Sequence, residues 1–351
     1  MIELICFSRH RVCWKAGFAS LVSLLLCFSM IKMEAASLTV RADSGTAFED
    51  SIQNALDQLP EGGEVTLGPG TYVIRKPIIL AHDGLRLVGS GPKTILFLDA
   101  NASCPVVILG APDRGSNPIK GLGLTDVFID GNRQHQQIEG WRRATDGSFI
   151  NNNGVDIRNV EDSLVERVTC CRCRSGGLVT SGGTRRLIVK DFTAFDNQFD
   201  GVACYLTEDS RFTGLSLHDN LAAGISLDLD FNNNVFERVA LSRNDLGIFM
   251  RDSCGNVFKD LAITGSRNHG VFMAQALDEE KPGWARRPGT ECTGNRFTDL
   301  RINNSGGSAF WVNDTSCTNN AIIGGSFLDN HQGGLAPMHA KLVKAEGLAG
   351  N

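Results

Sequence analysis

Two aspartates separated by one residue, Asp228 and Asp230, end a short run in which apolar and polar residues alternate. Paired carboxylates can act as a general acid and a general base, or they can hold Ca²⁺ through their oxygens. Tyr205 precedes Asp228 by the same interval at which Arg251 follows it; the tyrosine offers a proton donor, and the arginine could neutralise a uronate carboxylate. We therefore predict these four as catalytic residues. In the alternative interpretation, Asp228 and Arg251 form a surface ion pair that contributes little.

A second group of residues has the side chains that bind sugars. Phe249, Phe272 and Trp311 are spaced to form one solvent-facing row, and sugar rings stack on exposed aromatic rings. The alternative is that the inserted segment at about 276–291 folds over these rings and buries them in a local core. For His269, which lies beside this row, the alternative is a solvated histidine in a turn. We predict as substrate-binding residues Asp156, Arg158, Phe249, Phe272, Trp311 and His269.

These spacings follow a repeat of about 23 residues, a period typical of stacked repeat architectures. Small residues followed by an alternating apolar pair recur at nearly constant intervals, with one much longer step between Gly270 and Ala309, and a second apolar column keeps nearly the same intervals. Two columns in register indicate stacked units of similar structure, with one large insertion. The first column is Gly154, Gly177, Gly201, Gly224, Gly247, Gly270, Ala309 and Gly334, and the second is Val165, Val189, Phe212, Phe236, Phe258, Phe297 and Ile322.

Each unit contains short alternating stretches separated by clusters of Asn, Asp, Gly and Ser, which indicate strands and turns. A leucine-rich repeat has a similar period, but it requires a leucine frame and one strand per unit. We therefore predict an all-β fold, a right-handed parallel β-helix (solenoid) whose coils stack about 4.8 Å apart. We expect a single domain over residues 37–351, with insertions at about 133–147 and 276–291 that could form the lips of a cleft.

A capping helix is predicted at about 46–59. Thr46 and Glu49 form a capping box, and an apolar face follows at helical spacing before Pro60. Such a helix would cover the open end of the coils, where unpaired strand edges otherwise invite aggregation. The face consists of Phe48, Ile52, Ala55, Leu56 and Leu59.

Asparagines and cysteines also recur in columns. We interpret the asparagines as a structural ladder, in which each side-chain amide bonds to the next coil. The cysteines just before them could be stacked thiols or include one disulfide between adjacent coils. A separate cluster, Cys170, Cys171 and Cys173, resembles metal-ligand spacing only weakly, and we favour inward packing or a disulfide for it. The asparagines are Asn234, Asn256, Asn295 and Asn320, and the column cysteines are Cys254, Cys292 and Cys317.

The first 36 residues resemble a secretory signal peptide. Arg9, Arg11 and Lys15 precede an apolar stretch at 16–31, and cleavage is expected near Ala36. The stretch is short for a membrane span, although an uncleaved anchor is the alternative. Removal takes four basic and two acidic residues from totals of 34 and 39, leaving 30 and 37 and a formal charge of −7. We thus expect a secreted or periplasmic monomer without nucleic acid as a partner or a membrane span in the mature chain.

Several motifs resemble those of a known superfamily. Gly-Pro-Gly-Thr-Tyr at 68–72, Leu-Val-Gly-Ser-Gly at 87–91 and Phe-Ile-Asp-Gly-Asn at 128–132, after the end helix, are similar to the pectate-lyase-like superfamily of right-handed β-helix proteins. Within it, the stretch Ala-Phe-Asp-Asn-Gln-Phe-Asp-Gly at 194–201 resembles the catalytic module of secreted mannuronan C5-epimerases, enzymes that act on alginate.

The resemblance fails at the catalytic residues of that family. The epimerases carry an Asp-Pro-His triplet where this chain has Val179 and Ser181 in place of the acid and the histidine, and their further acidic residue falls at Tyr205. The resemblance therefore implies the fold and a carbohydrate ligand, and it assigns no catalytic residue.

From these patterns we predict an exported carbohydrate-active protein that binds and modifies an acidic, uronate-rich polysaccharide by lyase- or epimerase-type chemistry. One alternative is a glycoside hydrolase that uses Asp228 with Asp230 or Asp156. Another is a non-catalytic carbohydrate-binding solenoid, which the missing triplet favours. No cofactor is assigned with certainty, and Ca²⁺ is the metal ion that the aspartate oxygens would suit.

Overall fold

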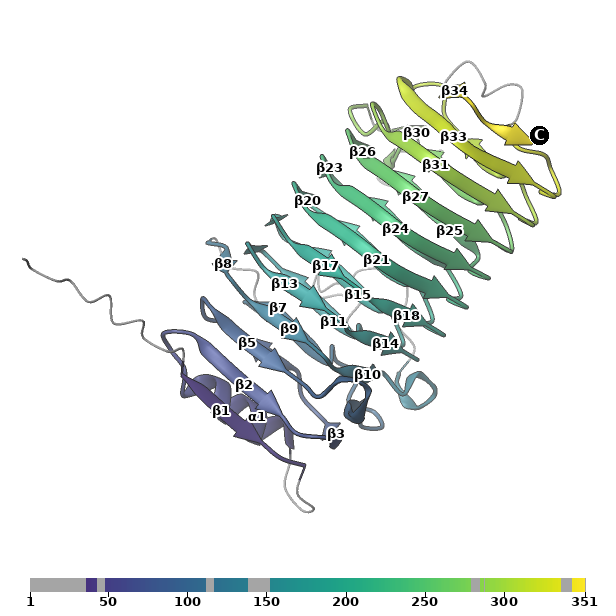
Figure 1. Cartoon of the computed structure of the whole chain (residues 1–351). Helices are drawn as coiled ribbons and strands as arrows, with labels where there is room; N and C mark the ends of the chain where they lie inside the picture. Colours follow the sequence, from purple (N-terminus) through teal and green to yellow (C-terminus); the bar gives the residue numbers. More distant parts are fainter. Residues whose placement is uncertain are drawn as a thin grey trace, which may run out of the picture. The chain divides into compact units, whose positions relative to one another are not determined.

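The computed structural model describes residues 36–42, 48–111, 117–137, 152–278, 285–286, 288–335 and 343–350 of the chain. The chain divides into Met1–Glu34 and Ala35–Asn351, and every element described below lies in the second part. Successive coils of this part lie side by side from β1 to β34 (Figure 1). Within the described residues the strands form sheets of 18, 9, 6 and 2 strands.

The nine-stranded sheet receives one strand from each successive coil, and all its strands are parallel. The six-stranded sheet follows it around the corner of the coil and is also parallel. The nine strands are β4 (Ile78–Leu80), β7 (Val107–Gly110), β11 (Val155–Arg158), β15 (Leu178–Ser181), β19 (Val202–Tyr205), β22 (Ala223–Asp228), β25 (Leu246–Arg251), β28 (Val271–Ala274) and β32 (Phe310–Val312). The six are β8 (Ile119–Lys120), β12 (Val160–Glu161), β16 (Thr184–Arg185), β20 (Thr207–Glu208), β23 (Phe231–Asn232) and β26 (Ser253–Cys254).

The 18-stranded sheet closes the remaining sides of each coil, and the two-stranded sheet is a small antiparallel hairpin within the later insertion. Two short 3₁₀ turns, η1 (Gly91–Lys93) and η2 (Arg133–His135), lie between strands. The hairpin is β29 (Leu277–Asp278) and β30 (Ala285–Arg286). The large sheet contains β1 (Ser37–Val40), β2 (Gly63–Leu67), β3 (Gly70–Ile74), β5 (Leu85–Val88), β6 (Thr94–Leu98), β9 (Gly123–Thr125), β10 (Phe128–Asp130), β13 (Leu164–Glu166), β14 (Thr169–Cys171), β17 (Ile188–Lys190), β18 (Thr193–Phe195), β21 (Arg211–His218), β24 (Val235–Ser242), β27 (Val257–Thr264), β31 (Arg296–Asn303), β33 (Asn320–Leu328), β34 (Val343–Glu346) and β35 (Ala349–Gly350).

The strand register confirms the predicted repeat. The residues after the small-residue anchors pair from coil to coil, for example Ile225 with Ile248 and Ile248 with Val271. The second column pairs throughout, and Phe236 and Phe258 stack with ring centroids 5.3 Å apart. The residues after the anchors and the residues of the second column point into one continuous buried core. The parallel β-helix predicted from the sequence is therefore confirmed.

The anchor glycines are required by close approach of neighbouring coils. A Cβ atom added to Gly247 would lie 2.3 Å from the carbonyl oxygen of Gly270 and 2.5 Å from the side chain of Ile263. Since real Cβ atoms do not approach backbone that closely, any larger residue here would push two coils apart.

The corners of the coils adopt left-handed backbone conformations in columns. One column contains Asp219, Arg243, Gly265 and Asn304, each with φ between 54° and 64°. Gly, Asn and Asp tolerate this conformation best, because their side chains are absent or can bond locally. Arg243 instead donates two hydrogen bonds of 2.7 Å to Asp219 of the preceding corner. Adjacent corners are thus joined by surface ion pairs.

The predicted asparagine ladder is present. Asn234, Asn256, Asn295 and Asn320 are buried, and in each of the first three the backbone N–H and the side-chain NH₂ donate to the amide oxygen of the next member at 2.9–3.2 Å. A second buried ladder, which the sequence analysis did not identify, has the same pattern. Its members are Asn197, Asn220 and Asn244. Both ladders satisfy polar groups that the coils bury at their turns.

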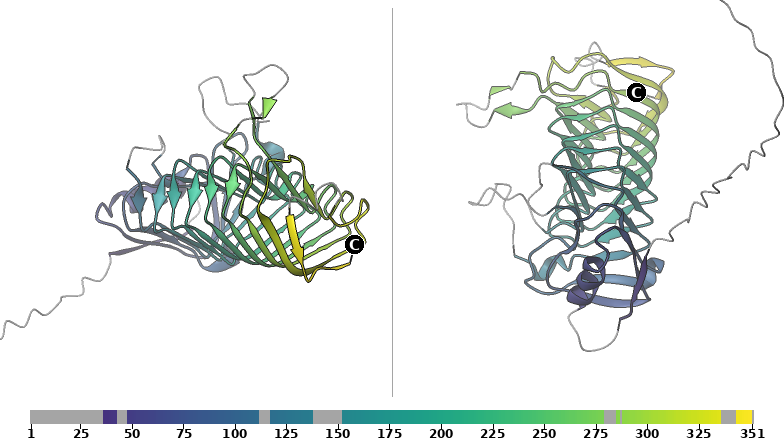
Figure 2. Two further views of the ribbon diagram at one scale, coloured as in Figure 1. Left: turned by 90° about the horizontal axis from the view of Figure 1, so that it is seen from above. Right: turned by 90° about the vertical axis from the view of Figure 1, so that its left-hand side faces the viewer.

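The predicted capping helix is α1 (Phe48–Asp57). Ile52, Ala55, Leu56 and Leu59 of its predicted face are buried in the core, and the side chain of Phe48 lies outside the described residues. The helix lies at the β1 end of the coils (Figure 2). It therefore covers the first coil, as expected.

The eight described cysteines are free thiols. Cys170, Cys171 and Cys173 are fully buried, which agrees with inward packing, and burial raises the pKa of each thiol. Cys292 and Cys317 lie on neighbouring coils, and the backbone N–H of Cys292 donates to Sγ of Cys317 at 3.4 Å. None of the helices in the described residues has the length and apolar character needed to cross a membrane. The predicted signal peptide lies outside these residues except for Ala36.

Candidate functional site

The outer face of the nine-stranded sheet carries most of the predicted site residues. On β22, Ile225 and Leu227 point into the core, so Ser226 and Asp228 point outward. Strand pairing places Tyr205 beside Asp228 on neighbouring coils. The predicted alternation therefore brings Tyr205, Asp228 and Arg251 together on three consecutive coils.

Asp228 is the centre of this group. Nε of Arg251 donates to its carboxylate at 2.9 Å, a second nitrogen of the same guanidinium also donates to it, and the N–H of Leu229 donates at 2.9 Å. The carboxylate is 6% exposed, whereas the arginine side chain is 32% exposed. The ion pair predicted as an alternative is therefore present, and it is much less exposed on the aspartate side than a typical surface pair.

Asp200 joins the group although the sequence analysis did not select it. It accepts a hydrogen bond of 2.8 Å from the N–H of Ala223 on the next coil. Burial raises the pKa of its carboxyl to about 7, against an ordinary value of 3.8, and the hydrogen bond only partly opposes this. Asp200 directly precedes the anchor Gly201, and this position was the only signal in the sequence that it borders the sheet.

Tyr205 interacts electrostatically with both Asp200 and Asp228. Burial raises the pKa of its phenol well above the usual value, and the charges of Asp200 and Asp228 raise it further. The phenol thus lies within electrostatic reach of both carboxylates and stays protonated at neutral pH. The three side chains form a group that we call the acid–base centre, consisting of Asp200, Tyr205 and Asp228.

Asp156 and Arg158 lie two coils before Tyr205 on the same face. Arg158 donates to the carboxylate of Asp156 at 2.7 Å, and the two side chains are nearly buried, at 12% and 7% exposure. Within the described part of the chain, both arginines on this face, Arg158 and Arg251, are therefore engaged in ion pairs with aspartates.

The predicted aromatic residues form one column on the other side of the acid–base centre. Phe249 and Phe272 stack at 5.8 Å with nearly parallel planes, and His269 lies between Phe272 and Trp311 at 5.9 and 5.1 Å. The guanidinium of Arg251 covers Phe249 at 5.1 Å from the ring centroid. The rings remain partly exposed, so they are not buried in a local core. Since their faces stack on one another, the column presents mainly ring edges to solvent.

His269 has a structural partner in this column. Its Nδ1 accepts a hydrogen bond of 3.0 Å from the N–H of Ser308 on the next coil, and burial lowers its pKa. The neutral ring therefore carries its proton on Nε2. Asp200 and Asn153 accept an N–H from the next coil in the same way.

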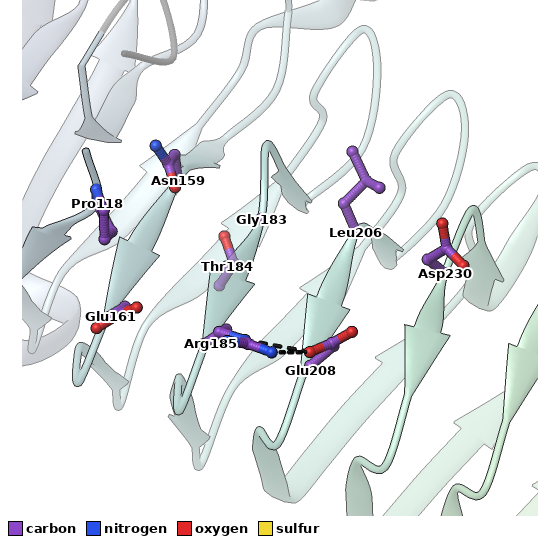
Figure 3. Close-up of a pocket in the computed structure, with 9 residues that line it drawn as sticks. All are labelled: Pro118, Asn159, Glu161, Gly183, Thr184, Arg185, Leu206, Glu208 and Asp230. Atoms are coloured by element: carbon purple, nitrogen blue, oxygen red, sulfur yellow. Dashed lines mark hydrogen bonds and ion pairs between the residues drawn. The ribbon is translucent and has the colours of Figure 1, made fainter. Parts of the chain in front are cut away.

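Asp230 is not part of the acid–base centre. It is exposed and lines a shallow pocket of about 520 Å³ around the corner, over the six-stranded sheet (Figure 3). Asn159, Arg185, Leu206 and Glu208 also line this pocket. The two predicted Ca²⁺ ligands are thus divided, with Asp228 bound to Arg251 and Asp230 turned to the pocket. Among the described residues, no group of three or more His, Cys, Asp or Glu is placed to hold a metal ion.

The two insertions are described only in part. In the later one, the N–H of Ala276 donates to the Thr290 hydroxyl at 3.1 Å and the Gln275 amide to Glu291 at 2.9 Å, so its two ends are held together at the coil. The hairpin of β29 and β30 stands away from the coils (Figure 2). In the earlier one, His135 belongs to η2. The tryptophans and arginines at the centres of the two predicted insertions lie outside the described part of the chain, namely Trp141, Arg142, Arg143 and Trp284.

Comparison with known proteins agrees with this architecture. A family model described as a right handed beta helix region matches residues 126–276. This chain has the fold of a right-handed β-helix. It is 28% identical over 197 residues to mannuronan C5-epimerase AlgE3 of Azotobacter vinelandii, in a match that covers 53% of this chain and 10% of that protein. The β-helix protein thus spans a small part of the length of this relative.

Solved structures show the same fold over most of the β-helix protein. The A-module of the A. vinelandii epimerase AlgE4 has a TM-score of 0.55 at 16% identity and covers 88% of this chain and 93% of its own. Endo-xylogalacturonan hydrolase from Aspergillus tubingensis has a TM-score of 0.65 at 12% identity, covering 90% and 93%. At such identities the likeness establishes the fold alone. The predicted resemblance to epimerase modules and pectate-lyase-like β-helices is confirmed.

Proposed function

We propose that this β-helix protein is a carbohydrate-active enzyme that binds a polysaccharide along the outer face of the nine-stranded sheet and hydrolyses a glycosidic bond there. The observation that carries the proposal is the acid–base centre, in which two carboxylates in different environments flank Tyr205. Asp200, with a pKa of about 7, can hold and release a proton near neutrality. Asp228 is held as an ion pair with Arg251.

The two carboxylates would take the two different roles that cleavage of a glycosidic bond requires. Asp200 would protonate the leaving oxygen as the general acid, and the ionised Asp228 would face the positive charge that develops on the sugar ring. Tyr205 would donate a hydrogen bond to a sugar oxygen between them. Arg251 would act as a positioning residue, because it holds the carboxylate of Asp228 and packs on Phe249.

Uronate proton abstraction is the second candidate, since a relative named as a mannuronan C5-epimerase is 28% identical over 197 residues. It has less support from the geometry. Both arginines of the described face are already paired with aspartates, so their positive charge is largely balanced before a uronate carboxylate approaches. The epimerase acid and histidine are replaced by Val179 and Ser181.

The test separates these reactions. The full chain is incubated with neutral and uronate polysaccharides, and three products are measured: new reducing ends, ultraviolet absorbance from unsaturated sugars, and deuterium exchange at C5. Hydrolysis predicts reducing ends alone, and Asp228→Asn should lower their rate by about 10²–10⁴. Unsaturated products or C5 exchange would support the second candidate instead. Binding without any product would indicate a carbohydrate-binding solenoid.

Export belongs to the same proposal. An enzyme that acts on a polysaccharide outside the cell must leave the cytoplasm, and residues 1–36 have the charge and apolar pattern of a secretory signal. Mass determination of the mature chain from culture medium or periplasm, with a new N-terminus near Ser37, would support it. An intact N-terminus in the cytoplasmic fraction would contradict it.

A further inference from the structure

The pocket that contains Asp230 lies next to the acid–base centre along the coils. Its lining residues come from corners that directly follow the outer face of the nine-stranded sheet. Leu206 follows Tyr205, Asn159 follows Arg158, and Asp230 comes two residues after Asp228. A ligand that crosses the acid–base centre therefore has this pocket immediately over the edge of the sheet.

The walls of the pocket combine donors and acceptors. Arg185 donates to Glu208 at 3.1 Å, as Figure 3 shows, and Glu161 is paired with Lys120 and Arg186 at 3.4 and 2.7 Å. Asp230 is exposed and makes no ion pair within the described part of the chain. Glu161 and Glu208 are thus each balanced by a cation, whereas Asp230 is not, and this unbalanced negative charge favours a ligand without a carboxylate.

Leu206 gives the pocket an apolar surface at a backbone position that disfavours leucine. Its side chain is 41% exposed, and its φ is 50°. Asn159 occupies the equivalent left-handed corner two coils earlier, with the same φ. A leucine in this conformation costs stability relative to asparagine, and its partial exposure limits the packing that could offset this cost. Contact with the apolar face of a sugar would account for its presence.

We propose that this pocket binds an uncharged sugar unit that branches from the polysaccharide on the nine-stranded sheet. The inference rests on the proposed function, because the backbone of the same glycan would lie across the acid–base centre. The hydroxyls of the branch would donate to Glu208 and Asp230 and accept from Arg185. A uronate branch would instead meet the carboxylates of Glu161, Glu208 and Asp230.

The volume is consistent with such a unit. About 520 Å³ accommodates one or two sugar rings, in the range typical of small-molecule sites. The pocket is open, so the branch would be held at its side while the backbone remains on the sheet. The pocket would then determine which glycans are bound, and the acid–base centre would determine the reaction.

The experiment compares linear and branched neutral oligosaccharides that share a backbone, namely mannan with galactomannan fragments and cellulose with xyloglucan fragments, by titration calorimetry on the full chain. We expect at least one branched fragment to bind about tenfold more tightly than its linear counterpart. Leu206→Asn and Asp230→Lys should each remove most of that difference and leave the affinity for the linear fragment unchanged.

Two controls exclude loss of folding or a general charge effect. Asp191→Lys makes the same charge change at another exposed left-handed corner, outside the pocket, and should preserve the branch preference. Leu206→Asn should raise the Tm by about 2 °C, since asparagine tolerates the left-handed backbone better. A variant that is more stable but binds branches less tightly would identify Leu206 as a ligand contact.

The outcomes distinguish the two proposals. Equal affinity of the native chain for linear and branched fragments, or a branch preference that persists in both pocket variants, would overturn the pocket proposal and leave the proposed function intact. Tighter binding of fragments with uronate branches would overturn its charge argument. If no neutral or acidic glycan binds, the proposed function fails together with the pocket.

Discussion

The asparagine ladders and the outer face of the nine-stranded sheet are built on the same repeat, but the ladders keep one residue type from coil to coil and the outer face does not. In the ladder, Asn234, Asn256 and Asn295 make identical contacts on successive coils. On the outer face, the matched positions carry Tyr205, Asp228 and Arg251. A column that keeps one residue type meets the same structural need in each coil. A column whose residue changes from coil to coil is where chemistry can be placed.

The largest effect should come from Asp200 on the variable side of this comparison. If the chain hydrolyses a glycan as proposed, Asp200→Asn should lower the rate by about 10³, because it removes the proposed general acid. Folding should persist, since Asn153 accepts the N–H of Gly176 at 3.1 Å at the equivalent position. The rate is measured as new reducing ends, with the Tm as the folding control. A variant that keeps full activity would remove Asp200 from the acid–base centre.

A ladder residue should affect stability and not the reaction. Asn256→Ala should lower the free energy of unfolding by about 3 kcal/mol, because buried partners on both neighbouring coils lose hydrogen bonds. Urea unfolding measures this loss. The activity of the protein that remains folded should be unchanged. A loss below about 1 kcal/mol, the net worth of a single hydrogen bond, would show that the ladder tolerates gaps.

The raised pKa of Asp200 should make the free energy of unfolding depend on pH. Its pKa is about 7 in the folded protein against an ordinary 3.8, so the folded state holds this proton more tightly. The contribution is complete below about pH 4, declines as the pH rises to about 7, and is constant above that. Relative to Asp200→Asn, the native protein should lose on the order of 2 kcal/mol between pH 4 and 8. If the stabilities of the two proteins changed with pH in the same way, the raised pKa of Asp200 would be contradicted.

The corner ion pairs should have the smallest effect. Arg243→Ala removes two hydrogen bonds to Asp219, but both side chains are exposed, and the expected loss is below about 1 kcal/mol. A double-mutant cycle with Asp219→Ala measures the coupling. A coupling energy above about 2 kcal/mol, well beyond that of an ordinary exposed pair, would mean that the corners, like the ladders, hold the coils together.

Much of the fold could be predicted because its columns repeat in the sequence. The inward-facing Phe236, Phe258 and Phe297 indicate their register by spacing alone, and the structure pairs them as expected. The second ladder, Asn197, Asn220 and Asn244, follows the same repeat, and a wider search for asparagine columns would have found it. Periodicity is thus sufficient wherever one residue type recurs.

The site was predictable only in part. Tyr205, Asp228 and Arg251 follow from strand alternation, but the raised pKa of Asp200 arises from burial, which no spacing reveals. The division of Asp228 from Asp230 depends on a left-handed turn at Leu229 and Asp230, with φ of 53° and 58°. This corner turns the chain onto the six-stranded sheet and places Asp230 in the pocket.

The ladders make the protein modular in length. Each asparagine offers the same acceptor to the coil before it and the same donors to the coil after it. One coil can therefore be duplicated or deleted while the hydrogen bonds between the coils on either side keep the same pattern. Each such change would extend or shorten the outer face of the nine-stranded sheet, the proposed glycan-binding surface, by one strand spacing, about 4.8 Å. A gene segment that encodes a single coil is therefore a natural unit of variation for this protein, and the length of the proposed binding surface would evolve in steps of that size.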